Sequence, residues 1–518
     1  MDSVISQQDD LNSKNPVDDQ SCLQDSTSHS VGSTDAGLHA ELSLLSIVAT
    51  GWNICNSWAA IAATMAISIA SGGPMTLLYG IMIMFVLGGS AALSMAEIAS
   101  VYPTAGGQYH WTSILAPDKF SRGLSYWCGI LNTFGWIASI AGFIVTFPSI
   151  ILALVSFWHP GYILQSWHAF LIFQTLNLLF TAYNIFLLKR SAWVMKVGFF
   201  MSIIAFFVIT TTCLAESNPK GTNVAVWNRF ENTSGWSSDA IVFFSGLVNP
   251  NFIYSGLDGA VHLAEECANA AVVVPRALIS TVIIGFITAF GFAVAMCYSY
   301  HEFDTVLAST FPALEVFYQA TLSKQVATFF AITIAIINLF AITGAQQTAS
   351  RLVYSFARDD AVVLSSYLSR IHARWDVPVP ALLFNGFCVF LLGCINLGST
   401  SAFNALVSTG MILSQLSYAF PAVLMLYHRA LGTMDKVMPV DQIRFRLPFG
   451  VGPIANILTI VLALLGLVFY DFPTVVPVTA ANMNYASAVI GVMALVAIAN
   501  WFWYARNCYH GPRLGGVH

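Results

Sequence analysis

Twelve long apolar runs dominate the sequence between residues 42 and 505. A helix needs roughly 20 apolar residues to cross the hydrocarbon core of a bilayer. No alternation of apolar and polar residues competes with these runs, so strands and pore-forming barrels are excluded. The sequence predicts an all-α polytopic membrane protein with about 12 transmembrane helices, at residues 42–70, 74–99, 123–156, 165–187, 192–214, 239–263, 275–300, 325–348, 379–397, 402–427, 452–470 and 484–505.

The composition agrees with a chain that lies in a membrane. The 518 residues are 57% hydrophobic and only 9% charged, whereas soluble proteins carry roughly 25% charged residues. The nine cysteines are scattered and show no metal-ligand spacing. We interpret them as small core residues, and we expect neither a metal site nor a cofactor.

The two termini are predicted to lie in the cytoplasm. Residues 1–41 are rich in Ser, Asp, Gln and Asn and should form a disordered tail, and they lack the basic start and apolar centre of a signal peptide. The cytoplasmic sides of membrane proteins are enriched in Lys and Arg. If the N-terminus is inside, most basic residues fall inside, namely Lys119, Arg122, Lys189, Arg190, Lys196, Arg276, Arg351, Arg358, Arg370, Arg374, Arg429, Lys436, Arg444 and Arg446, with Arg506 and Arg513 in the tail 506–518.

The outer connections contain few basic residues and one glycosylation sequon. Only Lys220, Arg229 and Lys324 would lie outside. Asn232 begins the sequence Asn-Thr-Ser in the outer loop after the fifth span, and glycosylation there agrees with this orientation.

The sixth apolar run is interrupted at a depth where an interruption is costly. Residues 249–277 contain Pro250, Gly256 and Gly259, and Asp258 puts a carboxylate at membrane depth. An unpaired backbone group in hydrocarbon costs several kcal/mol. Secondary transporters use such broken helices, because the freed backbone groups form the substrate site. The plainer interpretation is a proline kink followed by an ordinary helix end.

The first apolar run is interrupted in a similar way. Asn53, Asn56, Ser57 and Trp58 lie near its middle. Alone, this pattern could be a packing face with one hydrogen-bonded asparagine. Since the first and sixth runs are both broken, five spans apart, the pair indicates an inverted five-plus-five repeat.

Several spaced motifs resemble the amino acid–polyamine–organocation transporter superfamily. They are residues 96–100 (AEIAS) with 102–109 (YPTAGGQY), residues 255–266 (SGLDGAVHLAEE) followed by Pro275-Arg276, and Ser350-Arg351 with 356–360 (FARDD). Residues 56–58 (NSW) and 71–74 (SGGP) resemble the fungal branch that carries amino acids, choline and 4-aminobutyrate. The likeness covers about residues 42–505. One departure follows Asp360, where residues 361–364 (AVVL) replace the usual small residues and proline.

The resemblance implies a LeuT-like core of ten helices in a 5+5 inverted repeat, plus two added helices. The substrate would lie between the broken first and sixth helices, its carboxylate on backbone amides of residues 55–61 and its amine on carbonyls of residues 251–255. The implied substrate-binding residues are Asn56, Ser57, Trp58, Ala59, Phe252, Tyr254, Ser255 and Gly256.

Acidic and basic residues near the ends of the spans are interpreted as a cytoplasmic gate. This group contains Glu97, Asp258, Glu265, Glu266 and Arg351. Asp258 could instead pair with a substrate ammonium, because an acid inside a membrane is by default a functional candidate. Aromatic residues near the breaks, among them Trp58 and Phe252, could cage a quaternary amine, or they could simply pack in the core.

Lys196 is a candidate for ion coupling. It lies roughly one turn inside the fifth span and could simply extend its ammonium to the interface. Some proton-coupled proteins that resemble this chain carry a lysine there, where sodium-coupled ones hold sodium. The resemblance therefore predicts coupling to protons through Lys196.

These observations together predict a permease and not an enzyme. The chain is expected to import an amino acid or related small amine, with choline or GABA as alternative substrates and a transporter-like nutrient receptor as a second alternative. We expect it in the plasma membrane. No filter signature indicates an ion channel, and His110, His262 and His301 are isolated in the sequence, so no catalytic constellation is predicted.

Overall fold

The computed structural model describes residues 42–191, 193–448, 450–480 and 482–513. The predicted disordered tail at residues 1–41 lies outside the described residues. Within them, twelve helical stretches are long and apolar enough to cross a membrane, as predicted. No strand forms in this part of the chain, which holds only the isolated bridges Leu42–Cys267 and Ser71–Asn232.

The first five spans are close to their predicted positions. They are Leu44–Ala70, divided into α2 (Leu44–Cys55) and α3 (Ser57–Ala70), then α4 (Gly73–Ala99), α6 (Asp118–Trp158), α7 (Ser166–Phe186) and α8 (Trp193–Glu216). The 41 residues of α6 correspond to a length of about 60 Å, twice the hydrocarbon thickness, so this helix extends beyond a bilayer or tilts within it.

The other seven spans begin with the second broken helix. The sixth span, Asp239–Ala260, consists of α10 (Asp239–Gly246), α11 (Val248–Asn251), η2 (Phe252–Tyr254) and η3 (Leu257–Ala260). The rest are α12 (Ala270–Ser299), α15 (Lys324–Arg358), α17 (Val379–Gly398), α18 (Thr400–Leu431), α20 (Val451–Phe469), and α21 (Ala486–Asn500) continued by the π-helical η5 (Trp501–Ala505) and α22 (Arg506–Cys508).

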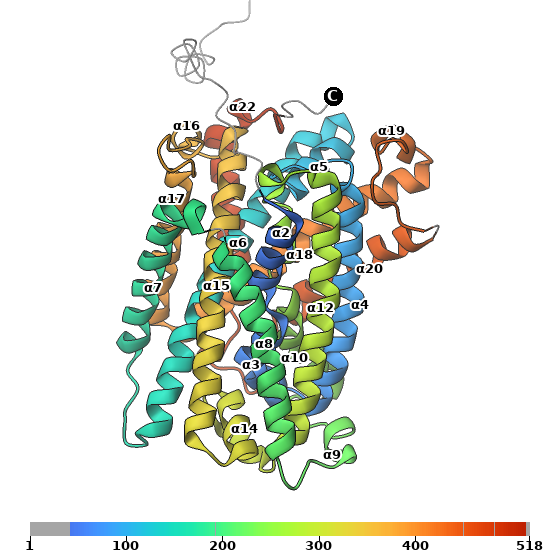
Figure 1. The fold of residues 1–518 in the computed structure, drawn as a ribbon. Coiled ribbons are helices and arrows are strands. Elements are labelled where there is room, and N and C mark those ends of the chain that lie inside the picture. Colours follow the sequence, from blue (N-terminus) through green and yellow to red (C-terminus); the bar gives the residue numbers. More distant parts are fainter. Residues whose placement is uncertain (1–41, 192, 449, 481, 514–518) are drawn as a thin grey trace, which may run out of the picture.

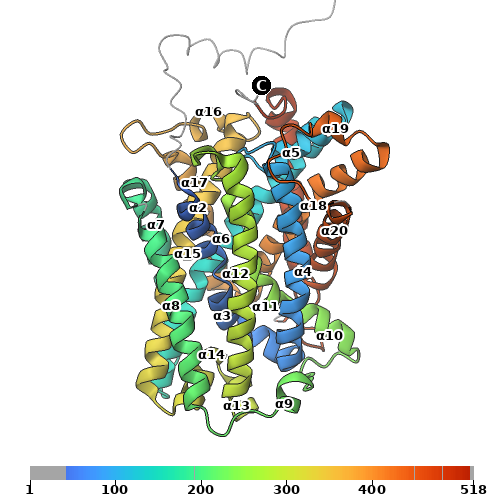
Figure 2. The same cartoon turned by 45° about the vertical axis from the view of Figure 1, so that its right-hand side comes forward.

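Short helices cover the two ends of the bundle. We call these ends the α5 end and the α14 end, each after one of its short helices. The α5 end, uppermost in Figures 1 and 2, carries α5 (Gln108–Leu115), α16 (Ser365–Leu368) and α19 (Met434–Val437). The α14 end carries α9 (Asn223–Trp227), α13 (Phe303–Ala308) and α14 (Pro312–Thr321). Short segments η1 (Leu188–Ser191) and η4 (Ala264–Glu266) link spans at the α5 end.

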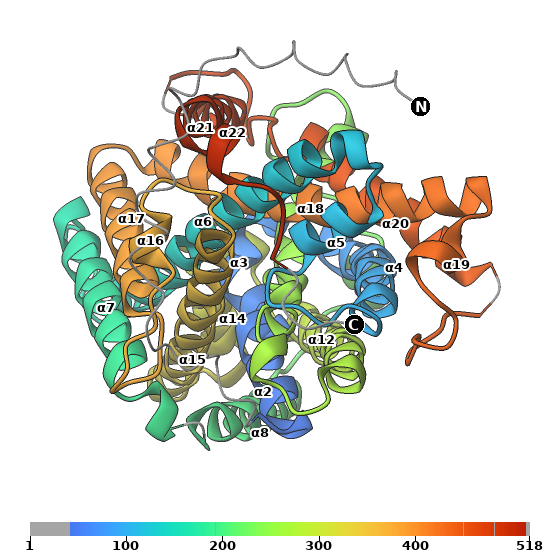
Figure 3. The same ribbon diagram turned by 90° about the horizontal axis from the view of Figure 1, so that it is seen from above.

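The broken spans lie inside the bundle and the added helices lie at its rim. Viewed from the α5 end, α21 and α8 lie on opposite sides of the molecule (Figure 3). In an apolar stretch of 18 residues within the first span, 67% is buried inside the protein, whereas in the corresponding stretch of the last span 17% is buried. The core therefore surrounds α2 and α3, which contact α8, α12, α15 and the pieces of the sixth span.

Candidate functional site

The breaks in the first and sixth spans are bonded to each other. Asn56 separates α2 from α3 with φ 30° and ψ 58°, in the left-handed region that asparagine tolerates better than most residues. In the sixth span, Ser255 is extended and Gly256 has a φ of 77°. The hydroxyl of Ser57 donates to the carbonyl of Ile253 over 2.6 Å, so the two unwound points lie side by side.

The unwinding in the sixth span lies beyond Pro250. The helix of the sixth span is first interrupted between Gly246, where α10 ends, and Val248, where α11 begins. Pro250 therefore falls in the first turn of a new helix, where its missing N–H leaves no hydrogen bond unmade. After Pro250, the backbone leaves helical geometry at Ser255 and Gly256, five and six residues further along the chain.

Asn56 is fixed by a short chain of hydrogen bonds. The indole of Trp58 donates to Ser202 Oγ over 3.0 Å, and Ser202 Oγ donates to Asn56 Oδ1 over 2.9 Å. Trp58 is fully buried and packs against Phe206 and Phe292. The structure thus places Trp58 in the core, where its ring supports the first break and cannot cage a cation in this arrangement.

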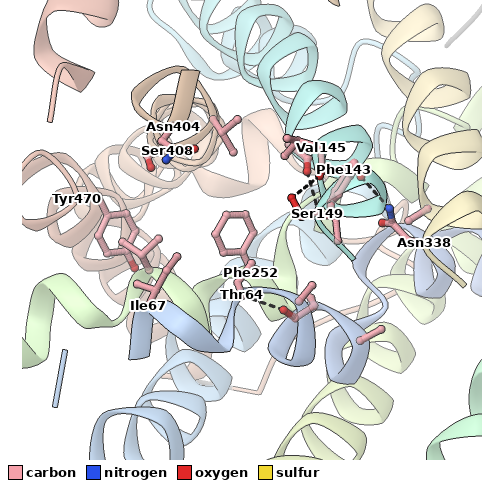
Figure 4. Close-up of a pocket in the computed structure, with 18 of the residues that line it drawn as sticks. Thr64, Ile67, Phe143, Val145, Ser149, Phe252, Asn338, Asn404, Ser408 and Tyr470 are labelled. Carbon is pink, nitrogen blue, oxygen red and sulfur yellow. Dashed lines mark hydrogen bonds between the residues drawn. The ribbon is translucent and has the colours of Figure 1, made fainter. Parts of the chain in front are cut away.

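A cavity of about 340 Å³ lies beside the two breaks, within the usual size range of small-molecule sites. It extends toward the α14 end, to the loop that follows α20. Figure 4 shows Phe252 between Ser408 and Tyr470 on one side and Ser149 on the other. Of the predicted substrate-binding residues, Asn56, Ala59 and Phe252 line this cavity.

The other predicted substrate-binding residues lie around the cavity and not in its wall. Ser57 joins the two breaks, and Trp58 is in the core. Tyr254, Ser255 and Gly256 line a separate void of about 20 Å³. That void is too small for an amino acid but holds space for water.

The wall of the main cavity carries polar and aromatic side chains but, among the described residues, no Asp, Glu, His, Lys or Arg. The polar residues are Asn56, Thr64, Thr146, Ser149, Ser245, Asn338, Asn404, Ser408, Thr474 and Asn484, and the aromatic residues are Phe143, Phe252, Phe469, Tyr470 and Phe472. The first N–H groups of α3 lack partners within the helix and form its positive end. Of residues 57–59 at this end of α3, Ala59 lines the cavity.

Asp258 lies outside the cavity, in a fully buried polar cluster. Tyr418 donates to its Oδ1 over 2.7 Å, and Gln108 and Trp136 donate to its Oδ2 over 3.0 and 3.2 Å. His262 Nε2 is 3.0 Å from the same oxygen. The cluster joins η3 to α5, α6 and α18 on the α5 side of the breaks.

Two ion pairs connect the sixth and eighth spans at the α5 end. Arg351, which is 2% exposed, donates to Glu266 over 2.6 Å. Arg358 donates to both oxygens of Glu265, over 3.0 and 2.9 Å. Burial raises the pKa of Glu265, but the hydrogen bonds and charge of Arg358 outweigh it and the pKa is lowered. These pairs join the sixth and eighth spans on the α5 side of the breaks.

Glu97 belongs to a different contact. It pairs with Arg429 over 2.6 Å, which joins the end of α4 to the end of α18. It therefore lies apart from the pairs formed by Glu265 and Glu266, although the sequence grouped it with them.

Lys196 and Asn232 lie away from the cavity. Lys196 is half-buried in the first turn of α8, next to Met195, whose carbonyl accepts a hydrogen bond from Asn53. Asn232 is exposed, and its amide donates to the Trp236 carbonyl and to Asp239.

Several members of these clusters were missed from the sequence. Arg358 was counted only as a basic residue, and His262 and His110 were treated as isolated. His262 follows Asp258 by four residues, a spacing that can bring two side chains together on one face and was the available signal. His110 in α5 pairs over 3.0 Å with Asp359, which directly follows α15, and the sequence offers no local signal for this contact.

Comparison with known proteins identifies the class of the molecule. Residues 42–495 match the family model described as amino acid permease. The chain is 32% identical over 501 residues to the choline transporter of Saccharomyces cerevisiae, covering 96% of this chain and 86% of that protein. It is 27% identical to the 7-keto 8-aminopelargonic acid transporter of that yeast, covering 86% and 89% of the two chains, and 29% identical to a putative amino acid/polyamine transporter of Macrophomina phaseolina, covering 85% and 97%.

These findings confirm the predicted resemblance and make the chain a multi-pass membrane transporter and not an enzyme. The match runs from the first broken span into the twelfth, so it includes both breaks and the cavity. The chain therefore belongs to the amino acid permease family.

Proposed function

We propose that this permease imports an amino acid or a related small amine by alternating access. The observation that carries the proposal is the bond between Ser57 and Ile253, which holds two helix breaks together beside a cavity of about 340 Å³. The substrate carboxylate would bind the N–H groups at the start of α3, and the ammonium would bind carbonyls of residues 251–255. Ile253 offers only its remaining lone pair, because Ser57 uses the other.

A quaternary amine such as choline is the second candidate substrate. The relative in Saccharomyces cerevisiae named choline transporter supports it, and so do the aromatic residues in the cavity wall. A cation over the face of an aromatic ring is attracted by the ring quadrupole. GABA would use the same two helix ends as an amino acid, and a nutrient receptor would bind without moving its ligand.

We further propose that the protein lies in the plasma membrane with its α5 end facing the cytoplasm, and that protons drive import. The ends of the spans at the α5 end carry most of the basic residues, which supports this orientation. Because the described cavity wall holds no Asp, Glu, His, Lys or Arg, a driving proton would bind elsewhere. Lys196 is the coupling residue that the resemblance implies.

Uptake of radiolabelled compounds by a permease-deficient host tests the substrate proposal. The panel contains the proteinogenic amino acids, GABA and choline, and the control is the host without the permease. Accumulation of an amino acid or GABA supports the first candidate, and accumulation of choline alone supports the second. If no compound accumulates despite surface expression, the import proposal fails, and ligand binding without uptake then indicates a receptor.

The driving ion is tested with the compound that accumulates. Uptake should increase as the outside pH falls, collapse with a protonophore and be unaffected by the removal of sodium. Lys196→Met should abolish the dependence on pH if Lys196 carries the coupling. A requirement for sodium would contradict proton coupling altogether.

A further inference from the structure

A second cavity, of about 910 Å³, lies between α17 and the last span and shares no residue with the cavity beside the breaks. Its other walls come from α6, α15, α18 and residues 362–368. The volume falls within the range of roughly 300–1,000 Å³ that is usual for ligand sites. We call this cavity the α21 groove, because α21, at the rim of the bundle (Figure 3), forms one whole side of it.

The wall of the α21 groove is almost entirely apolar. Among the described residues it contains no Asp, Glu, His, Lys or Arg. Thr409, Tyr485 and Asn500 use their polar groups in hydrogen bonds to other parts of the protein. The hydroxyl of Thr133 has no partner in the described part of the chain. Because a polar group buried without partners costs free energy, the groove suits a hydrocarbon chain and not a polar solute.

The α21 groove extends along the whole of the last span. One face of this span lines it, at residues 485, 488, 489, 492, 493, 496, 499, 500 and 503. From Tyr485 to Trp503 a helix rises about 27 Å, at about 1.5 Å per residue. The hydrocarbon core of a bilayer is about 30 Å thick. The groove therefore follows the depth of the hydrocarbon core.

The α21 groove opens sideways onto the surface of the bundle. Val492 and Val496 on α21 and Leu391 on α17 are exposed, whereas Leu413 at the floor of the groove is buried. In a bilayer, the surface around these helices is covered by acyl chains. An acyl chain can therefore enter the groove from the membrane without crossing water.

Two exposed arginines flank the mouth of the groove at the α5 end. Arg506 follows the groove residue Trp503 by three positions, and Arg370 follows the groove residue Leu368 by two. Arg370 donates to the carbonyl of Ser366, and neither arginine forms an ion pair within the described residues. This mouth therefore carries positive charge that no carboxylate of the described chain neutralises.

The acidic residues nearby are already paired. Asp359 is buried and bonded to His110, and Asp360 pairs with Arg513. They follow the end of α15, whose last turns line the groove. Neither acid therefore compensates the two arginines at the mouth.

The opposite mouth, at the α14 end, carries an acid instead. Asp471 accepts a hydrogen bond from the N–H of Ser487, which follows the groove residue Tyr485 by two positions. A negatively charged group would be repelled there and attracted at the α5 end. The charges at the two mouths thus set the direction in which an anionic lipid would lie.

We infer that the α21 groove binds an acyl chain of an anionic phospholipid whose headgroup contacts Arg370 and Arg506. Basic pockets between transmembrane helices attract anionic headgroups. Trp503 is 87% exposed at the same mouth, and tryptophan is enriched where a membrane meets water. The inference adds a lipid site to the transporter and depends neither on the substrate nor on the driving ion.

The bound chain would contact the helix that carries two arginines of the ion pairs. Val353 and Phe356 lie at the floor of the groove, in the part of α15 between Arg351 and Arg358. These arginines hold the sixth span through their pairs with Glu266 and Glu265. A lipid in the groove therefore stabilises α15 in the arrangement that forms both pairs.

Binding is measured on the full chain, purified in detergent and depleted of lipid. Native mass spectrometry counts the lipids that stay bound, and thermal unfolding is followed as each lipid is titrated. The wild type should retain one dioleoyl phosphatidylserine per chain, and its unfolding temperature should rise and then level off. Dioleoyl phosphatidylcholine has the same chains and tests the headgroup. Dihexanoyl phosphatidylserine has the same headgroup and tests the chains, and both should bind more weakly.

Two kinds of variant test the two parts of the site. Val496→Trp should fill the groove and abolish retention, and its control is Leu495→Trp, because Leu495 is 67% exposed on α21 but does not line the groove. If Val496→Trp does not fold, Leu391→Trp fills the groove from α17.

Arg370→Gln and Arg506→Gln should each lower the affinity for phosphatidylserine about fivefold, the usual contribution of one basic residue near an anionic lipid. Arg444→Gln is their control, since Arg444 is an exposed arginine in the loop after α19 and lies outside the groove.

The inference is overturned if phosphatidylcholine stabilises the wild type as much as phosphatidylserine does. Equal loss of lipid by the filling variant and by Leu495→Trp, or by the arginine variants and by Arg444→Gln, would also contradict it. So would retention of a sterol in place of phosphatidylserine, or a dimer that holds no lipid, because the groove would then have a different occupant.

Discussion

At the scale of single residues, Gly256 is a position at the second break where any side chain would be both strained and crowded. Its φ of +77° lies in the left-handed region, and a Cβ atom there would lie 2.5 Å from Ile54 Cγ2 and 3.1 Å from the Trp136 ring. Gly256 thus allows the sixth span to approach α2 and α6 at the level where the chain unwinds.

Gly256→Val should therefore abolish uptake. The left-handed conformation costs a non-glycine residue roughly 1–2 kcal/mol, and overpacking adds typically 1–3 kcal/mol. The measurement is radiolabelled uptake normalised to surface expression. Gly161→Val is the control, since no heavy atom lies within 4 Å of a Cβ at Gly161. Normal uptake by Gly256→Val would place the site elsewhere.

Ser57→Ala should lower transport by about tenfold, because it leaves the Ile253 carbonyl without its 2.6 Å hydrogen bond. An unsatisfied buried group costs about 1–3 kcal/mol, and 1.4 kcal/mol corresponds to a factor of ten. The effect is measured as kcat/KM for uptake. Ser149→Ala is the control, because Ser149 lines the cavity but donates only to the Val145 carbonyl of its own helix. Equal effects of the two changes would remove Ser57 from the site.

Phe252→Leu distinguishes the two substrate candidates. Phe252 lines the cavity at the second break (Figure 4). A cation–π contact in a desolvated site is worth about 2 kcal/mol, so the KM for a quaternary amine should rise by more than about tenfold. Phe252→Tyr retains the aromatic face and should restore a KM near that of the wild type. A KM for choline that Phe252→Leu leaves unchanged excludes a cage at this residue.

At the scale of secondary-structure elements, α5 links several parts of the α5 end through its first three residues. Its first residue, Gln108, bonds to Asp258, and its Tyr109 and His110 bond to Asp359 at the end of α15. Burial raises the pKa of Asp359, but His110, the Arg513 N–H and Tyr109 outweigh it and the pKa is lowered. The element is thus fixed to both the sixth and the eighth spans.

Glu265→Gln should weaken the closed α5 end by about 1.5–3 kcal/mol, the range for a hydrogen bond to a charged group. The pKa of Glu265 is lower in the folded protein than the ordinary glutamate value. Its ion pair with Arg358 therefore stabilises the α5 end fully when the pH is above the ordinary value. This stabilisation is lost as the pH falls through the lowered pKa. The loss of thermal stability in detergent should therefore be the same at every pH between about 5 and 8. A loss that varies within this window would contradict the assignment.

At the scale of the whole molecule, the end of the chain contributes a buried residue to the α5 end. The last helical run continues through η5 and α22 to Cys508, beyond the boundary at residue 505 suggested by hydropathy. Tyr509 is fully buried against Phe356 and Tyr126, and its hydroxyl bonds to Ser125 over 2.5 Å. Of residues 506–513, Tyr509 is buried, and the N–H of Arg513 donates to Asp359.

Tyr509→Ala should destabilise the protein by about 3–5 kcal/mol, as removal of a buried aromatic ring does elsewhere. Thermal unfolding in detergent measures the change. Tyr427→Ala is the matched control, since Tyr427 is 44% exposed. If the two variants unfold at the same temperature, the C-terminal segment does not stabilise the bundle.

The sequence by itself determined the properties that depend on consecutive residues. Hydropathy over about 20 residues located all twelve spans, and the polar residues around Asn56 and the glycine at 256 marked the spans that break. These features are local, because the bilayer acts on each segment separately and backbone geometry depends on neighbouring residues.

Only the tertiary structure decided which side chains meet across segments far apart in the chain. It placed Trp58 in the core and Phe252 in the cavity, it paired Glu265 with Arg358, and it enclosed Asp258 with His262, Gln108 and Tyr418. The physical reason is that the partners of a buried polar group must come from whichever helix packs against it, often more than a hundred residues away. Hydropathy shows that such a group needs a partner, and packing chooses the partner.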